Sequence, residues 1–244
     1  MKQTTFRMCI VLIAVGLWGS SALALDSIGA PRSGLGEKEW GLGFDYMFSD
    51  MDLGGNLVDR NADEDLRVNK IFGTIGYGPV EPMDVFVGLG LGNAEGDGVT
   101  AYGDAIEWGS TELAWRFGTR VTFYKSTNGK WEWGGVLSVS EFESEEHEGH
   151  DKVELNEMQI AVGPTRHLSD SVALYGGLFY HNVDGTATEG DDYYEPYTSS
   201  LDLHAFGIFV GGLFTINDVA SLCAEFQVHD EAVGFGTGFC WRIP

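Results

Sequence analysis

Residues 40–48 read Trp-Gly-Leu-Gly-Phe-Asp-Tyr-Met-Phe, and this stretch decides the expected fold. Every second residue is large and apolar, and most of the residues between them are small or polar. Successive side chains of a β-strand point to opposite faces, so the pattern predicts a strand with one apolar face. That face comprises Trp40, Leu42, Phe44, Tyr46 and Phe48.

The same alternation recurs along the rest of the chain, where glycine supplies 35 of the 244 residues and often fills the positions between the apolar ones. Including the strand that begins after residue 37, the pattern predicts ten strands. An eight-stranded barrel is the alternative, if the lead-in or one weak segment (66–78 or 153–164) is not a strand. The further expected strands cover residues 66–78, 85–91, 109–125, 130–142, 153–164, 172–181, 201–214, 222–229 and 233–243.

The connections between these strands alternate in length. Short turns follow the second, fourth, sixth and eighth strands, whereas long acidic segments follow the first, third, fifth and seventh. This layout is typical of a transmembrane barrel with short periplasmic turns and long extracellular loops. We therefore expect an all-β, antiparallel, up-and-down transmembrane barrel with both termini in the periplasm. The long segments are Ser49–Asp65, Asn93–Glu107, Glu143–Lys152 and Asp184–Ser200.

The first residues have the pattern of a secretory signal peptide. Lys2 and Arg7 precede an apolar run over residues 8–18, and Ala22-Leu23-Ala24 fits the small-x-small cleavage rule. The run would span only ~16 Å as a helix, about half of the hydrocarbon core, which argues against a transmembrane anchor. The expected organisation is a signal peptide over 1–24, a periplasmic lead-in over 25–36 and the barrel over 37–244.

Charge excludes one class of partner. The chain has 14 Lys and Arg against 37 Asp and Glu, a formal net charge of −23. Nucleic-acid binding needs a basic patch, so no nucleic acid is expected.

The face opposite the apolar one is mostly Gly, Ser and Ala, which suits a crowded barrel interior better than a water-exposed surface. A water-soluble secreted β-barrel, with the two faces exchanged, is the alternative.

Nine charged side chains fall on the face of small residues. Five are acidic and four are basic, and this near balance predicts ion pairs that fill a narrow lumen, because a lone buried charge is costly. The alternative is a conducting path lined by charge, although open porins use about 16–18 strands. The predicted lumen charges are Asp45, Lys70, Glu112, Arg116, Arg120, Glu132, Glu157, Glu225 and Arg242.

Six aromatic residues fall beside the short turns or the chain termini. Their positions predict an aromatic girdle at the periplasmic boundary of the membrane, where amphipathic rings are enriched. Ordinary core aromatics are the alternative interpretation. The predicted girdle comprises Trp40, Tyr77, Phe123, Trp131, Phe214 and Trp241.

The last strand contains Gly236-Thr237-Gly238-Phe239-Cys240-Trp241, which is similar to the glycine-x-x-aromatic-x-aromatic assembly signal of outer-membrane barrels. With its signal peptide, alternating segments and acidic loops, the chain resembles small bacterial outer-membrane barrels of the OmpA/OmpW-like and opacity-protein-like kind over residues 37–243. The resemblance implies the outer membrane, its lipid and lipopolysaccharide, and recognition of the last strand by the barrel-assembly machinery. The family usually ends on the aromatic residue, whereas Arg242-Ile243-Pro244 follows here.

Chemistry-bearing motifs are weak. Asp202-Leu203-His204 and Asp50-Met51-Asp52 resemble the paired motifs with which ten-stranded omptin proteases activate water, but parity places His204 on the apolar face. His147 and His150 lie in an acidic loop that could bind a divalent cation, without a defined ligand spacing. No nucleotide, zinc or nucleophile-elbow motif is present, so neither a cofactor nor an enzymatic activity is expected.

Cys223 and Cys240 both fall on the inward face. A hairpin centred on Glu231-Ala232 would place the two cysteines opposite each other and allow a cross-strand disulfide in an oxidising compartment. Two buried thiols are the alternative.

The expected function is that of a structural or surface-interaction protein with acidic extracellular loops, to which divalent cations could bind, and a mostly filled lumen. A narrow porin-like channel and an omptin-like barrel hydrolase are the alternatives.

Overall fold

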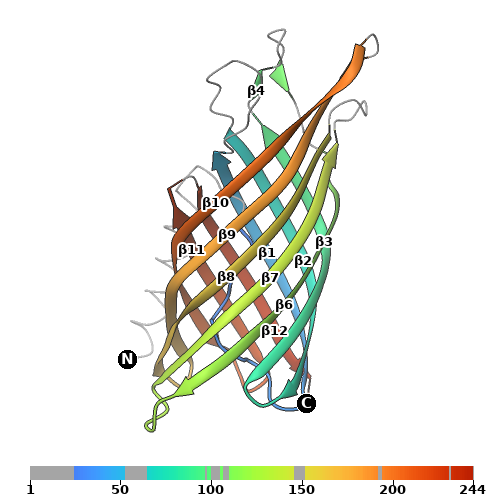
Figure 1. Cartoon of the computed structure of the whole chain (residues 1–244). Helices are drawn as coiled ribbons and strands as arrows, with labels where there is room; N and C mark the ends of the chain where they lie inside the picture. The colour runs from blue at the N-terminus through green and yellow to red at the C-terminus, as the bar shows by residue number, and fades with distance from the viewer. Residues whose placement is uncertain are drawn as a thin grey trace.

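The computed structural model describes residues 25–52, 65–96, 98–99, 105–106, 110–145, 152–191, 194–230 and 232–243. In this part of the chain, ten antiparallel strands form one closed barrel, and β4 (Gly98–Val99) and β5 (Ala105–Ile106) form a separate two-stranded sheet (Figure 1). The barrel strands are β1 (Trp40–Asp52), β2 (Asp65–Val80), β3 (Met83–Gly96), β6 (Glu112–Lys125), β7 (Trp131–Glu145), β8 (Lys152–Ser169), β9 (Val172–Asp191), β10 (Tyr194–Thr215), β11 (Ala220–His229) and β12 (Ala232–Ile243).

Neighbours in the sequence are neighbours in the barrel, and β1 closes it against β12. The closing register runs from Trp40 opposite Ile243 to Met51 opposite Ala232. Closure pairs the strand edges that an open sheet would expose, which a lipid environment requires. The predicted ten-stranded, up-and-down transmembrane barrel is therefore confirmed, and the eight-stranded alternative is wrong.

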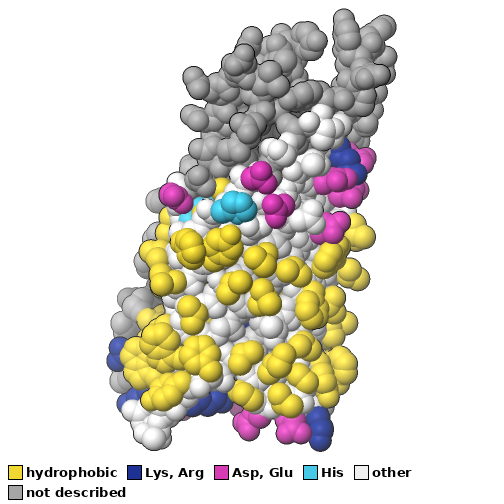
Figure 2. Space-filling view, in the orientation of Figure 1, with side chains coloured by type: hydrophobic (Ala, Val, Ile, Leu, Met, Phe, Trp, Pro, Cys, Tyr) yellow, Lys and Arg dark blue, Asp and Glu magenta, His cyan; other side chains and the backbone are white. Residues whose placement is uncertain are grey.

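The apolar faces of the strands point outward. Phe206, Leu178 and Leu113 are 79%, 63% and 67% exposed, whereas Lys70 and Arg116 on the opposite face are 2% and 1% exposed. Figure 2 shows the hydrophobic side chains as a broad band, with acidic side chains above it. On β10 the apolar face runs from Phe206 to Phe214, and a tilted strand of this length covers roughly 20–25 Å, the height of a transmembrane barrel's apolar belt. This arrangement confirms the outer-membrane type of barrel and excludes the water-soluble one.

The strands extend into all four expected long loops, and furthest into two of them. The segment 184–200 was expected to be a loop, but β9 and β10 continue their pairing through it, as in the pairs Asp184–Asp202 and Thr188–Thr198. The segment 93–107 contains the end of β3 and the small β4–β5 sheet. A strand needs only about 9–11 residues to cross the membrane, so the 20-residue β9 and the 22-residue β10 extend well beyond it. In the described part of the chain, no helix is long and apolar enough to span a membrane.

The predicted periplasmic lead-in over 25–36 is wrong in its location. These residues, here called the lumen segment, run inside the barrel, where Leu25, Asp26 and Ile28 are at most 2% exposed (Figure 1). The segment has no periodic pattern of its own, but its backbone and side chains find partners on the inner faces of several strands. Where the lumen segment touches the wall, the wall residue must be a glycine: a Cβ atom at Gly134 on β7 would collide with the carbonyl oxygen of Pro31.

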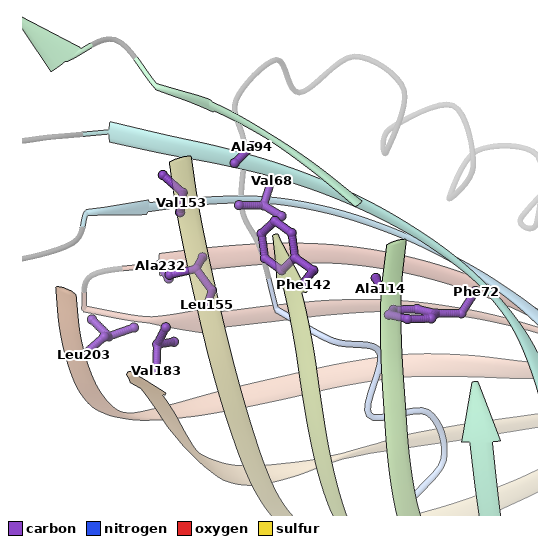
Figure 3. Close-up of a cluster of buried hydrophobic side chains, with 10 residues drawn as sticks. All are labelled: Val68, Phe72, Ala94, Ala114, Phe142, Val153, Leu155, Val183, Leu203 and Ala232. Atoms are coloured by element: carbon purple, nitrogen blue, oxygen red, sulfur yellow. The ribbon is translucent and has the colours of Figure 1, made fainter. Parts of the chain in front are cut away.

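The rest of the interior is filled by apolar and small side chains. One cluster lies in the extracellular half of the lumen, where Phe72, Phe142 and Leu155 from three different strands point inward (Figure 3). A second cluster packs directly on the lumen segment and includes Leu25, Ile28, Tyr175, Phe179 and Phe209. The lumen thus has a packed core, as expected for a barrel of this size.

Candidate functional site

The lumen segment is anchored at two levels. In the middle of the barrel, the backbone N–H of Ile28 donates to Glu225 Oε1 at 2.9 Å, and Gln227 Nε2 donates to the carbonyl oxygen of Asp26 at 2.8 Å. At the periplasmic end, the Asp84 carboxylate accepts hydrogen bonds from the Ser33 hydroxyl at 2.7 Å and from the backbone N–H groups of Gly34 at 2.6 Å and Leu35 at 3.3 Å. Hydrogen bonds to charged acceptors are the stronger ones, so these contacts hold the segment against the wall.

A buried ion network lies beside the upper anchor. Lys70 Nζ lies 2.5 Å from Glu157 Oε1 and 3.2 Å from Asp26 Oδ1, and the three side chains are at most 3% exposed. His181 Nε2 lies 3.6 Å from Glu157 Oε2. Because Asp26 belongs to the lumen segment, the segment supplies one of the two carboxylates that compensate Lys70.

A second ion pair lies lower in the lumen. Arg116 bonds Asp45 through Nη2, and the same atom donates to the Thr74 hydroxyl at 2.7 Å. The guanidinium also lies over the rings of Phe72 and Phe86, at 4.7 Å and 5.5 Å from their centroids. Cation–π contact and hydrogen bonding together fix this buried cation.

A third group surrounds Glu132 near the periplasmic rim. Its carboxylate lies 3.3 Å from Arg32 Nη1, 3.6 Å from Lys125 Nζ and 3.3 Å from His167 Nε2. Arg32 comes from the lumen segment, so the segment contributes a cation here and an anion at Lys70. The structure therefore brings six of the nine predicted lumen charges into contact with partners through these three groups and Glu225.

The other three predicted lumen charges lie differently. Glu112 is half-buried at the start of β6. Arg120 lies over the Phe86 ring at 4.5 Å, without a carboxylate partner among the described residues. Arg242 lies at the periplasmic mouth of the lumen rather than deep inside it: the residue is exposed, and its Nε lies 3.8 Å from Glu39 Oε2. The alternation along β12 points the Arg242 side chain inward, but the residue lies so close to the end of the strand that water reaches it.

The sequence analysis missed three charged residues that join the lumen segment to the barrel wall. Asp26 and Arg32 lie on the lumen segment, and Asp84 lies at the start of β3, just before the strand predicted from the pattern. One signal was available: Asp26 and Arg32 have opposite charges and lie in a segment whose apolar residues show no period. Charge alone, however, does not place a segment inside a barrel.

The predicted disulfide is wrong, because the register of the last hairpin differs from the expected one. His229 pairs with Ala232, which centres the turn one residue earlier than predicted and shifts the pairing by two residues. Cys223 therefore faces Gly238, and Cys240 faces Ser221. Both cysteines are free thiols.

The six aromatic residues predicted as a girdle all lie at the end of the barrel that carries the short turns. Trp40 and Tyr77 are cross-strand partners with ring centroids 4.7 Å apart, and Trp40, Phe123 and Trp241 are more than half exposed. The sequence analysis missed a second aromatic pair at the opposite edge of the apolar band. There Tyr180 and Phe206 have ring centroids 5.0 Å apart.

The two motifs that resemble those of omptin proteases do not lie together in the structure. Asp50 lies on β1 and His204 on β10, and β11 and β12 separate these strands in the barrel. His204 and Asp202 are exposed on the outer face, above Phe206. His147 and His150 lie outside the described residues. In the part of the chain that is described, no group of three or more His, Cys, Asp or Glu side chains is arranged to hold a metal ion.

A cavity of about 170 Å³ lies inside the periplasmic half of the barrel. It is bounded by the lumen segment on one side and by the strands around the β1–β12 seam on the other. Its polar lining includes Asp45, Arg116, Arg120, Cys223 and Arg242, and the β10–β11 turn at 217–219 forms part of its mouth.

The chain is similar to several solved structures at low sequence identity. No protein-family model matches the chain, and no curated protein matches it. Among solved structures, Ail, the attachment invasion locus protein of Yersinia pestis, is 14% identical over 85% of this chain and 99% of its own, with a TM-score of 0.41. OprG of Pseudomonas aeruginosa is 9% identical over 86% and 98%, with a TM-score of 0.45. The outer membrane protease OmpT of Escherichia coli is 9% identical over 91% and 100%, also with a TM-score of 0.45.

Proposed function

We propose that this protein is a closed outer-membrane barrel with a structural or surface-interaction role. One observation carries the proposal: the lumen segment occupies the interior and is tied to the wall by buried ion pairs and by hydrogen bonds to Asp84 and Glu225. A barrel filled in this way has no continuous aqueous path, so transport of solutes is not its resting activity. Its extracellular surface, which the sequence makes strongly acidic, is then the part that interacts with other molecules.

A narrow channel is the second candidate, and a specific feature favours it. The lumen segment is not a strand of the wall, so it could leave without breaking the barrel's hydrogen-bonded ladder. Its departure would uncover a lumen lined by Lys70, Glu157, Arg116 and Asp45. In this alternative the segment is a plug that leaves the lumen spontaneously, so the wild-type protein conducts intermittently.

Recordings from single barrels in planar bilayers separate the two candidates. We expect no conductance steps from the wild-type protein and discrete steps from a variant that lacks residues 25–35. Heat-modifiable migration on SDS gels would show that both proteins are folded, because an intact barrel changes its apparent size only when boiled. Steps from the wild-type protein would support the channel, and silence from both proteins would show that the remaining side chains close the lumen by themselves.

We also propose that divalent cations link the extracellular end of the barrel to lipopolysaccharide. Asp184 and Asp202 are exposed cross-strand partners just above the apolar band, and like charges in this position repel each other. A divalent cation shared with a lipid phosphate would relieve that repulsion. Binding to lipopolysaccharide should therefore weaken in excess chelator and in Asp202→Asn, whereas binding that persists in chelator would count against the proposal.

No enzymatic activity is part of the proposal. The positions of the motif residues argue against an omptin-like hydrolase, because β11 and β12 separate His204 on β10 from Asp50 on β1, too far apart to share a water. Peptidase assays with the wild-type protein and with His204→Ala test this directly. A cleavage activity that is present in the wild type and lost in His204→Ala would support the hydrolase alternative.

A further inference from the structure

We propose that the periplasmic cavity binds a small anionic solute, a carboxylate or phosphate compound, at the guanidinium of Arg120. The proposal goes beyond the closed-barrel role, because the cavity lies beside the lumen segment and reaches the β10–β11 turn at the periplasmic end rather than crossing the membrane. Three features carry the proposal: an uncompensated cation, a second buried guanidinium with an unused donor, and a volume that fits a small molecule.

The first feature is the balance of charge around the cavity. Four arginines line it, and three of them have carboxylate partners: Arg32 with Glu132, Arg116 with Asp45, and Arg242 with Glu39. Arg120 makes neither an ion pair nor a hydrogen bond with any described residue, and its Nε is buried without an acceptor.

The carboxylate best placed to compensate Arg120 is already used. Asp84 is the direct cross-strand partner of Arg120, but its oxygens accept the hydroxyl of Ser33 and the N–H groups of Gly34 and Leu35. Arg120 instead lies over the Phe86 ring, 4.5 Å from its centroid. A guanidinium has five N–H donors and no acceptor, so Arg120 offers a complete set of unused donors to an oxyanion.

Arg116 provides the second donor edge. This residue is 1% exposed, and although its Nη2 bonds Asp45 and Thr74, its Nε has no partner. Leaving a buried N–H of a charged group without an acceptor is costly. An anion in the cavity would supply acceptors to Arg120 and, from the same site, to Arg116.

The size of the cavity sets the class of ligand. A volume of about 170 Å³ exceeds the roughly 150 Å³ that accepts benzene in an engineered protein cavity. Nucleotides and polymers are therefore too large, whereas inorganic phosphate and short organic acids fit. Leu35 and Leu213 also line the space and could contact a short aliphatic chain.

Titration calorimetry on the detergent-solubilised full barrel tests the proposal, with inorganic phosphate and succinate as separate probes. We expect saturable binding of at least one probe, and the comparison between them distinguishes a phosphate site from a carboxylate site. In Arg120→Gln the affinity should fall by about tenfold or more, the effect of losing a charge-assisted hydrogen bond. Arg166→Gln is the matched control, since Arg166 lies over the Trp131 ring at 5.2 Å but is exposed outside the barrel.

A second measurement keeps the test valid if Arg120→Gln perturbs the lumen segment. Cys240 lines the cavity and is exposed, so its reaction with thiol reagents reports the local potential. An anionic methanethiosulfonate should react faster than a cationic one, and the ratio of rates should fall in Arg120→Gln but not in Arg166→Gln. The proposal is overturned if neither probe binds, if both variants bind as the wild type does, or if the anionic reagent has no advantage.

Discussion

Lys70 on β2 and Glu157 on β8 meet across the lumen, with 2.5 Å between Nζ and Oε1 and with both side chains at most 2% exposed. Three strands lie between β2 and β8 on the shorter way around the barrel, so this contact ties together parts of the wall that share no backbone hydrogen bonds. Asp26 joins the pair from the lumen segment, which makes Lys70 the point at which wall and segment are held together.

Replacing Lys70 by Met should destabilise the barrel strongly, because it leaves Glu157 and Asp26 as buried, uncompensated carboxylates. Removing one partner of a buried ion pair costs about 3–5 kcal/mol. Urea titration followed by heat-modifiable gel migration measures the loss. Lys125→Met is the control: Lys125 is 56% exposed, and its pair with Glu132 is worth about 1 kcal/mol or less. Equal losses in the two variants would show that the buried network does not stabilise the fold.

The outward apolar face predicts a depth-dependent cost of charge. Val210 lies midway between Phe206 and Phe214 on β10 and is 58% exposed. Val210→Arg should cost about 2–4 kcal/mol in lipid, whereas His204→Arg, at the edge of the apolar band, should cost about 0–1 kcal/mol. Unfolding in lipid vesicles measures both. Similar costs at the two positions would mean that the membrane boundary does not lie between Phe206 and His204.

The register of the last hairpin predicts which cysteine pairs can form. Ser221 is the cross-strand partner of Cys240, and both lie on the inner face. Ser221→Cys should therefore form a disulfide with Cys240 under mild oxidation, whereas the wild type should keep Cys223 and Cys240 reduced under the same conditions. Mass spectrometry of tryptic peptides without reductant distinguishes the two cases. A Cys223–Cys240 bridge in the wild type would restore the register first predicted.

The lower anchor of the lumen segment can be probed with trypsin. Asp84→Ala removes the acceptor for Ser33, Gly34 and Leu35, so the segment should separate from the wall at the periplasmic end. Cleavage after Arg32 should then become about tenfold faster or more, the effect of losing hydrogen bonds to a charged acceptor. N-terminal sequencing of the product identifies the site. Asp218→Ala, in the turn at the same mouth, should leave the rate unchanged, and unchanged cleavage in Asp84→Ala would contradict the anchoring role.

The sequence alone determined the wall of the barrel. Whether a side chain such as Phe206 or Lys70 faces lipid or lumen follows from its parity within one strand, and parity is a local property that periodicity reveals. The number of strands, the alternation of short and long connections and the position of the periplasmic aromatic residues follow from the same local pattern.

Only the tertiary structure decided what meets inside that wall. Lys70 and Glu157 pair because closure of the barrel brings β2 and β8 to face each other, and no local pattern encodes that meeting. The two-residue shift at Cys223 depends on where a tight turn forms, and period two is the same in both registers. The lumen segment was missed because it has no period to detect: unmet charges and hydrogen-bonding groups on several strands, gathered only when the barrel closes, hold it there.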